Sequence, residues 1–187
     1  MQALQQIVNG VNVDQLVDTI NAIEKTPDLG KFTFRANNEW LDGAHNRTSI
    51  QGFYGAGQED TSRSKAFVYN ADEPPVLLGA NHGANPVEYV LAALASCLTT
   101  SLVFYAAAQG VKIEDVELQL EGDLDVRGFL GLSEDVRNGY ENIQVTLKVK
   151  GEASEEQLEK LVELVQRRSP VFDIISNPVP VSVRMEK

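Results

Sequence analysis

The segment that most restricts the fold of this chain is an uncharged, apolar stretch from Tyr89 to Val111, YVLAALASCLTTSLVFYAAAQGV. As a helix it is long enough to span a bilayer, which needs ~20 apolar residues. However, the stretch contains serines, threonines and many alanines, acidic sequence flanks it on both sides, and no basic loop would orient it. We therefore expect the central helix of a soluble core and no membrane partner.

The start of this helix is marked by the sequence Asn85-Pro86-Val87-Glu88. Asn85 is suited to cap the helix, Pro86 to its first position, and Glu88 to reach back to the cap, which already explains Glu88 structurally. Cys97 follows Glu88 by nine positions, so the two lie about 13 Å apart on opposite sides of one helix. They can therefore meet only across two chains.

Small side chains on the same helix permit the close approach of a second helix. They are Ala92, Ala93, Ala95, Ser96, Thr99 and Thr100. Because a helix that is apolar all round is hard to bury in a chain of this size, we expect a homodimer with paired central helices.

The rest of the chain mixes strands and helices without a βαβ rhythm, which predicts an α+β class. We expect a helix at 11–25, strands at 31–36, 47–54 and 64–70, a hairpin turn within 37–46 and a loop at 55–63. Further on we expect strands at 113–126 and 141–151, a helix capped by Ser154, a short helix from Ser169, and a last strand from Pro178. Residues 1–30 are expected to be a helical extension and 31–187 a single domain.

Charge and cysteine content exclude several classes of function. With 16 Lys and Arg against 27 Asp and Glu, the net charge of −11 argues against nucleic acid and anionic membranes as partners. Cys97 is the single cysteine, so no disulfide within the chain and no cysteine-based metal cluster can form. His45 and His82 are too few and too far apart in sequence to indicate a metal site, and we expect neither a metal nor a cofactor. The N-terminus lacks a secretory signal, which favours a cytoplasmic location.

The motif NPVEYVLAALASCL, together with LLGANHGANP before it and RRSPVFDIISNPVPV near the C-terminus, resembles the osmotically inducible protein C and organic hydroperoxide resistance (OsmC/Ohr) family. The resemblance extends from about Phe32 to Arg184. It implies an intertwined α+β homodimer, with long buried central helices packed against antiparallel sheets. It also implies an oxidative stress function, in which a reactive cysteine on the helix reduces organic hydroperoxides and a second cysteine resolves it.

Position by position, the resemblance assigns Cys97 to the reactive cysteine and places Ser169 where the resolving cysteine stands. The family's glutamate falls on Val87, one residue before Glu88. The arginine that some members use falls on Leu77. Arg47 lies near the position that other members use, in a region of loose alignment.

These differences leave two functions open. In the first, Cys97 is the nucleophile of a one-cysteine, peroxiredoxin-like thiol peroxidase that needs an external thiol, because Ser169 cannot form a disulfide. Arg47 or Arg63 would then supply the cation, and Glu88 of the partner chain would orient it. In the second, a dimer without turnover binds or senses an apolar small molecule at the same interface.

The candidate residues also have structural explanations. Arg47 and Arg63 are typical surface or strand arginines. His82 is expected either to line the substrate pocket or to be a solvated loop histidine. Ser169 is expected either to contact substrate or to cap the short helix that follows. Cys97 itself can be a small buried apolar residue.

Overall fold

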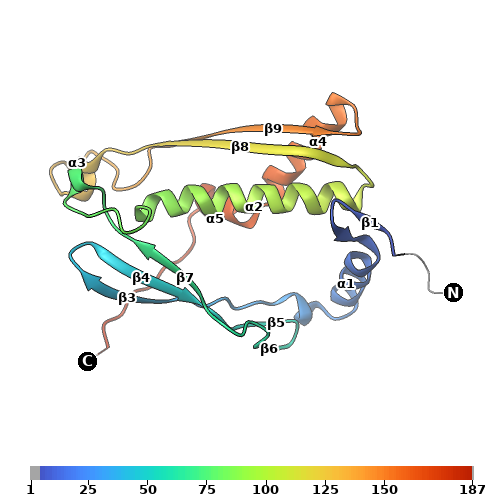
Figure 1. Cartoon of the computed structure of the whole chain (residues 1–187), viewed down its shortest axis with the longest axis horizontal. Coiled ribbons are helices and arrows are strands. Elements are labelled where there is room, and N and C mark those ends of the chain that lie inside the picture. The colour runs from blue at the N-terminus through green and yellow to red at the C-terminus, as the bar shows by residue number, and fades with distance from the viewer. Residues whose placement is uncertain (1–4, 187) are drawn as a thin grey trace. The chain divides into compact units, whose positions relative to one another are not determined.

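The computed structural model describes residues 5–186, which form two compact units. The C-terminal unit contains the described residues up to Val13 together with those from Leu91 onward, and the N-terminal unit contains Asp14–Val90. Figure 1 traces the elements of both units.

The C-terminal unit is built around most of helix α2 (Pro86–Ala108), whose first residues belong to the N-terminal unit. The antiparallel pair β8 (Ile113–Asp123) and β9 (Asn142–Gly151) runs along this helix (Figure 1). The remaining elements of the unit are β1 (Ile7–Val8), β2 (Val11–Asn12), α3 (Val126–Phe129), α4 (Glu155–Arg168) and α5 (Pro170–Ser176). The central helix, both long strands and the two C-terminal helices confirm the sequence predictions.

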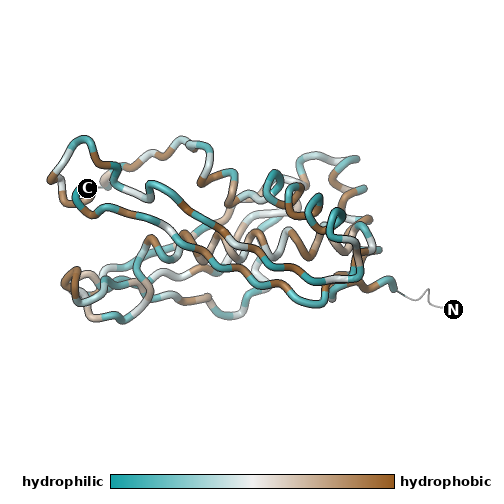
Figure 2. Tube along the Cα trace, turned by 90° about the horizontal axis from the view of Figure 1, so that it is seen from above, coloured by the Kyte–Doolittle hydropathy of each residue, from teal (hydrophilic) through white to brown (hydrophobic). Residues whose placement is uncertain are grey.

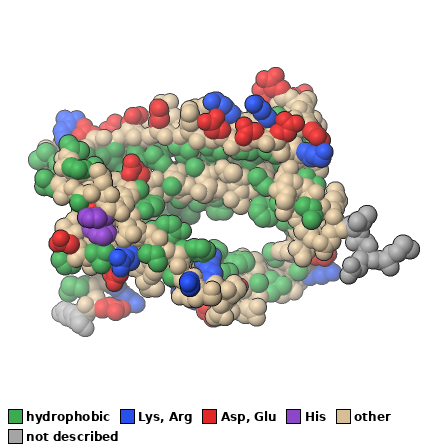
Figure 3. Space-filling view, in the orientation of Figure 1, with side chains coloured by type: hydrophobic (Ala, Val, Ile, Leu, Met, Phe, Trp, Pro, Cys, Tyr) green, Lys and Arg blue, Asp and Glu red, His purple; other side chains and the backbone are tan. Residues whose placement is uncertain are grey.

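One face of α2 forms the core of this unit. Its buried core members are Leu94, Leu98, Leu102 and Ala106, joined by Leu161 and Val165 of α4. Alternate residues of β8 pack on this cluster, because side chains of a strand alternate between its two faces. Figure 2 shows that alternation as brown and teal along the long strands. Many of the other side chains on these strands are charged or polar, and acidic and basic groups gather along this edge in Figure 3. Lys148 of β9 forms an ion pair with Glu117 of β8 at 3.4 Å.

By length and composition, α2 is also a helix that could cross a membrane, with a mean hydropathy of 1.9 over its most apolar window. Core helices of soluble proteins pass the same test. Here Leu94, Leu98 and Leu102 of α2 belong to the core cluster, whereas other side chains of the helix are exposed.

The strands β1 and β2 are joined to the rest of the C-terminal unit through Asn9. The short strands β1 and β2 form a hairpin that turns at Asn9 and Gly10, both of which have positive φ. The Asn9 side chain donates to the carbonyl oxygen of Val111 and accepts from the backbone N–H of Ile113, each at 2.9 Å. Residues 7–12 are thus a strand pair, whereas the sequence analysis placed 11 and 12 in a helix.

The N-terminal unit holds a helix and two small antiparallel sheets. Its elements are α1 (Val13–Lys25, whose first residue precedes the unit), η1 (Pro27–Gly30), β3 (Asn37–Asp42), β4 (His45–Ile50), β5 (Phe53–Gly55), β6 (Gln58–Asp60), β7 (Phe67–Ala71) and η2 (Pro75–Leu77). The strand order is β3-β4-β7 in the larger sheet, and β5 pairs with β6 in the smaller one.

Three boundary predictions were wrong. Residues 31–36 form no strand beyond an isolated bridge between Thr33 and Tyr54. The segment Asn37–Asp42 instead forms β3, and the turn is confined to Gly43 and Ala44, where Gly43 has a φ of 54°. The expected loop at 55–63 contains the hairpin of β5 and β6, which turns through positive φ at Ala56 and Gly57.

The predicted last strand is also not formed. Residues 177–186 belong to no helix or strand of the described chain. Alternate side chains there are exposed and apolar, namely Val179, Val181, Val183 and Met185. The alternation that predicted a strand is therefore present, but this segment has no strand to pair with among residues 5–186.

Candidate functional site

Cys97 lies on α2 and is partly buried. Its sulfur is contacted by the hydroxyl group of Ser169, which donates a hydrogen bond to Cys97 Sγ at an Oγ–Sγ distance of 3.1 Å. Ser169 is 1% exposed, so its hydroxyl is shielded from water. The structure thus brings together two of the residues that the sequence analysis singled out, although they are far apart in the sequence.

The position of Ser169 follows from two helix ends that meet at this residue. Ser169 ends α4 and caps α5, and its Oγ accepts a hydrogen bond from the backbone N–H of Phe172 at 3.3 Å. Pro170 occupies the first position of α5, which confirms the predicted cap. Val165, one turn earlier on α4, is fully buried in the core. The Ser169 hydroxyl group therefore accepts a hydrogen bond from α5 and donates its own proton to Cys97 Sγ.

The local chemistry around the sulfur is that of a thiol with one neutral donor. In the C-terminal unit, no lysine or arginine among the described residues forms a hydrogen bond with Cys97 Sγ. A hydroxyl at this distance can solvate a negatively charged sulfur, and it can also donate to a sulfur-bound oxygen. It cannot supply a second thiol.

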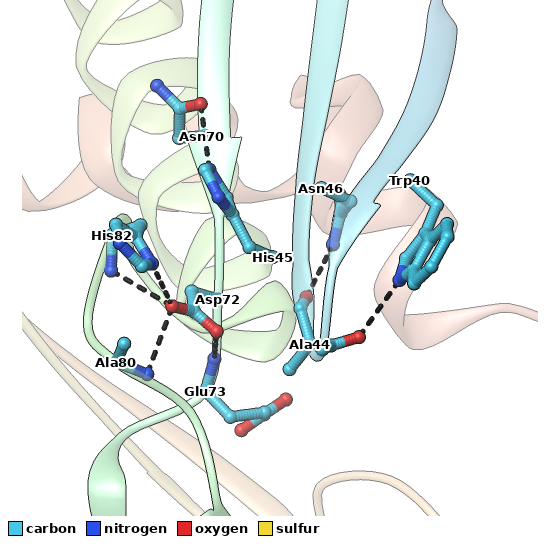
Figure 4. A network of polar contacts seen from close by, with 10 residues as sticks. Trp40, Ala44, His45, Asn46, Asn70, Asp72, Glu73, Ala80 and His82 are labelled. Carbon is cyan, nitrogen blue, oxygen red and sulfur yellow. Dashed lines mark hydrogen bonds and ion pairs between the residues drawn. The ribbon is translucent and has the colours of Figure 1, made fainter.

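A second polar cluster lies in the N-terminal unit around Asp72, a buried carboxylate with 2% exposure (Figure 4). Asp72 accepts hydrogen bonds from the backbone N–H groups of Glu73, Ala80 and His82, at 2.8, 3.1 and 3.1 Å. The His82 ring adds a fourth contact, from Nδ1 to Oδ2, at 2.8 Å. These donors, foremost the backbone N–H of His82, hold the pKa of Asp72 far below its usual value of 3.8.

This carboxylate organises the loop that precedes α2. The loop winds tightly around it, because a Cβ atom on Gly79 would overlap Glu73 and one on Gly83 would overlap Asn70. Leu78 and Asn81 adopt positive φ within the same loop. The sequence analysis missed Asp72. The pattern that could have indicated it is an acidic residue followed by a loop rich in glycine and asparagine.

The two histidines are neighbours, contrary to the expectation from their separation in sequence. The His45 and His82 rings stack at 4.4 Å between centroids, with planes 14° apart (Figures 3 and 4). His45 Nε2 lies 3.1 Å from Asn70 Oδ1, and His82 Nδ1 lies against Asp72. His82 is thus an oriented histidine rather than a freely solvated one, although its side chain is 55% exposed.

The other candidate residues all have local partners in the N-terminal unit. Arg47 forms an exposed ion pair with Glu39 at 3.4 Å. Arg63 donates to the carbonyl oxygen of Gln51 at 3.0 Å, and its guanidinium lies over the rings of Phe53 and Phe67, 5.1 and 5.3 Å from their centroids. These contacts account for both arginines as surface residues without assigning them a role in catalysis.

Glu88 has the capping role that the sequence predicted. Its carboxylate accepts from the backbone N–H of Asn85 at 2.8 Å, while the Asn85 side chain accepts from the N–H of Val87 at 2.9 Å. The Asn85 amide also donates to the Glu73 carboxylate. The start of α2 is thereby fixed to the same loop that surrounds Asp72.

The fold of the chain matches solved structures at low sequence identity. An OsmC-like protein from Mycoplasma pneumoniae has a TM-score of 0.58 and 14% identity, with 78% of this chain and 89% of that chain covered. An organic hydroperoxide resistance protein OsmC from Legionella pneumophila has a TM-score of 0.54 and 18% identity, with 76% of this chain and 88% of that chain covered. An organic hydroperoxide resistance protein from Elizabethkingia anophelis has a TM-score of 0.52 and 16% identity, with 78% of this chain and 89% of that chain covered. No curated protein matches the sequence.

A mixed α and β architecture with antiparallel sheets is therefore the fold that this chain shares with these proteins. The family model described as OsmC-like protein matches residues 79–184, more than half of the chain. The chain belongs to the OsmC-like family. The matched range includes both Cys97 and Ser169.

Proposed function

We propose that this protein is a one-cysteine thiol peroxidase that reduces organic hydroperoxides at Cys97. The observation that carries the proposal is the 3.1 Å contact between the Ser169 hydroxyl and Cys97 Sγ, which puts a hydrogen-bond donor where the family places a resolving thiol. Family membership supports the chemistry, since the similar structures from Legionella pneumophila and Elizabethkingia anophelis are organic hydroperoxide resistance proteins.

The proposed reaction has two stages. First, the Cys97 thiolate attacks one peroxide oxygen, so that a sulfur–oxygen bond forms and the oxygen–oxygen bond breaks. The alkoxide leaves, takes up a proton and becomes an alcohol, and Cys97 is oxidised to a sulfenic acid. Second, an external thiol attacks the sulfenic sulfur and releases water, and another external thiol then displaces Cys97 from the mixed disulfide. One hydroperoxide and two thiols thus yield one alcohol, one water and one disulfide.

Ser169 has a defined part in this scheme. Its hydroxyl hydrogen-bonds the attacking sulfur and stays beside the sulfenic oxygen, but it cannot condense with it. The sulfenic acid therefore waits for an external thiol and is exposed to further oxidation when none is present. We assign a substrate contact to Ser169 in the C-terminal unit. Three further roles stay predictions: His82 and Arg63 as substrate contacts, Arg47 or Arg63 as the cation that stabilises the leaving oxygen, and Glu88 of a partner chain as the group that orients this cation.

We further propose that the protein acts as an intertwined homodimer with α2 helices paired. Several side chains along one face of α2 are exposed although the helix has no charge after its first turn; they include Ala92, Ser96, Thr100 and Phe104. The Ser96 hydroxyl group donates a hydrogen bond to the carbonyl oxygen of Ala92 at 2.8 Å. Because this hydroxyl is already paired within the helix, it adds little polarity to the exposed face. The exposed valines of residues 177–186 likewise favour a strand pairing supplied by a second copy.

The dimer predicts a mass of twice the 20.5 kDa of one chain in sedimentation velocity at micromolar concentration. Ser96→Glu places a charge on the exposed face of α2 and is expected to shift the protein to monomer, because a charge buried between two helices is strongly unfavourable. Thr61→Glu, in an exposed part of the N-terminal unit, is the matched control and should remain dimeric. A wild-type protein that sediments as a single chain contradicts the proposal.

The activity is tested by following consumption of cumene hydroperoxide with dihydrolipoamide or dithiothreitol as reductant. We expect turnover by the wild type and a loss of ~1,000-fold or more for Cys97→Ser, since a hydroxyl is a far weaker nucleophile at neutral pH. If Cys97→Ser consumes peroxide as fast as the wild type does, Cys97 is not the nucleophile.

The second candidate function is a dimer that binds or senses an apolar small molecule without turnover. It is favoured by one observation, namely that no guanidinium or ammonium group of the described C-terminal unit bonds the Cys97 sulfur. The same assay separates the two functions, because a wild-type protein inert to hydroperoxide with either thiol supports the binding function. A cytoplasmic location is a prediction of both.

A further inference from the structure

The C-terminal unit has an open apolar cavity of about 250 Å³ lined by residues of α2, β9, α4 and α5. Its lining residues are Leu98, Ile143, Val145, Leu147, Val162, Val165, Gln166 and Phe172. All but Gln166 are apolar. The three residues from β9 are alternate positions on one face of the strand, so this face is not fully covered by α4.

A wider hollow of about 580 Å³ adjoins the cavity at the end of α4. Its lining residues are Leu164, Gln166, Arg167, Arg168, Phe172, Asp173 and Asn177. Gln166 and Phe172 belong to both linings, so the two hollows lie on either side of these side chains. The side chain of Gln166 is exposed and forms no hydrogen bond with residues 5–186, so it does not form a fixed barrier.

The charge at this hollow is opposite to that of the chain as a whole. The side chains of Arg167 and Arg168 are exposed, and neither guanidinium forms an ion pair or a hydrogen bond in the described part of the chain. Asp173 is the one acid of the lining, and its carboxylate accepts from the Asn177 amide at 2.8 Å. The lining thus carries two guanidinium groups and one carboxylate, in a chain with a net charge of −11.

An apolar cavity beside two unpaired guanidinium groups matches a ligand with an apolar chain and an anionic head. We propose that this double hollow binds a linear aliphatic carboxylate, with its chain against Val145 and Phe172 and its carboxylate at Arg167 and Arg168. A guanidinium group recognises a carboxylate through two parallel hydrogen bonds. Asp173 in the same lining disfavours a dianionic head such as a phosphate monoester. The proposal does not depend on the chemistry of Cys97.

The site is tested by isothermal titration calorimetry of the wild-type protein with decanoate, below the concentration at which decanoate forms micelles. We expect saturable binding that tightens about threefold to fourfold for each methylene added from octanoate to decanoate. Decanol should bind at least tenfold more weakly, and decyltrimethylammonium should show no saturable binding, because both lack the anionic head.

Two variants locate the ligand. Arg167→Gln with Arg168→Gln should weaken decanoate binding by about tenfold or more. Lys112→Gln with Lys160→Gln removes the same charge from exposed ion pairs elsewhere and should leave binding unchanged. Val145→Phe fills the apolar cavity from a position that is 36% exposed, so the variant is expected to fold and to lose binding.

No saturable binding of decanoate to the wild type overturns the proposal. Equal binding of decanol or of the ammonium compound does so as well, and so does a double arginine variant that binds like the wild type. None of these results bears on the proposed peroxidase activity, because that activity is tested separately by comparing hydroperoxide consumption by the wild type and by Cys97→Ser.

Discussion

Ser169→Cys is expected to convert this protein into a two-cysteine peroxidase. The serine Oγ lies 3.1 Å from Cys97 Sγ, and a cysteine at the same position needs only a small adjustment to bring its sulfur to bonding distance. After hydroperoxide oxidises Cys97 to the sulfenic acid, the new thiolate attacks that sulfur, a disulfide forms and water leaves. The thiol count of the variant should therefore fall from two to zero after one equivalent of hydroperoxide.

Two further results should accompany the disulfide. The wild type, in excess hydroperoxide without reductant, is expected to proceed to the sulfinic acid, whereas the variant is protected because its sulfenic acid is consumed first. The oxidised variant should also be stabilised by about 4 kcal/mol against its reduced form, since the disulfide closes a long loop in the unfolded chain. Mass spectrometry and denaturant unfolding measure the two effects.

Cys97→Ser in the Ser169→Cys background is the matched control, and it should keep its single thiol in the same experiment. Ser169→Ala removes the hydroxyl without adding a thiol and should form no internal disulfide. A Ser169→Cys protein that still has both thiols after oxidation would show that the two side chains do not meet as described.

Asp72→Asn is expected to produce the largest loss of stability outside the core. The carboxylate receives three backbone N–H groups and the His82 ring, and an amide in its place turns its NH2 group toward some of these donors. We expect the Tm at pH 7 to fall by roughly 5 °C or more. Differential scanning calorimetry measures the change.

The pH dependence of this effect has a definite sign. In the folded protein the pKa of Asp72 lies below its usual value of 3.8, because the donors around it stabilise the charged form. Its contribution to stability is therefore fully present above about pH 4 and is lost as the pH falls through the folded-state pKa. The difference in Tm between wild type and Asp72→Asn should accordingly shrink as the pH is lowered from 4.

Asp135→Asn is the control for the loss of one negative charge, because Asp135 is exposed. It should change the Tm by little at either pH. If Asp72→Asn also leaves the Tm at pH 7 unchanged, the carboxylate does not hold the loop before α2.

The sequence predicted those parts of the fold whose causes are local. The cap formed by Asn85 and Glu88, and the capping box of Ser154 and Gln157, involve residues three positions apart, so both could be identified from spacing. The strands β8 and β9 were expected from period-two patterns on either side of a connection, and the structure pairs them antiparallel.

The errors arose where contacts override local preference. Polar Asn37 and Asn38 form a strand because they pair with Ser49 and Thr48 of β4, a pairing that the residues themselves do not indicate. Residues 177–186 show a strand pattern but form no strand, since a strand exists only with a partner.

The candidate site was predictable only in part. Cys97 and Ser169 were identified through the family resemblance, but their hydrogen bond depends on how α4 packs on α2. Asp72 was missed because its partners, the N–H groups of Ala80 and His82, become donors to it only when the loop closes. Long-range contacts of this kind leave no periodic signal in the sequence.

The central claim is that the Cys97 thiol reacts directly with an organic hydroperoxide, and it is tested by a single-turnover experiment without reductant. One equivalent of cumene hydroperoxide is added in the presence of dimedone, which traps sulfenic acids. The account predicts loss of the one thiol per chain and a dimedone adduct on Cys97, with neither in Cys97→Ser. A wild-type protein that keeps its thiol while the hydroperoxide stays intact would contradict it.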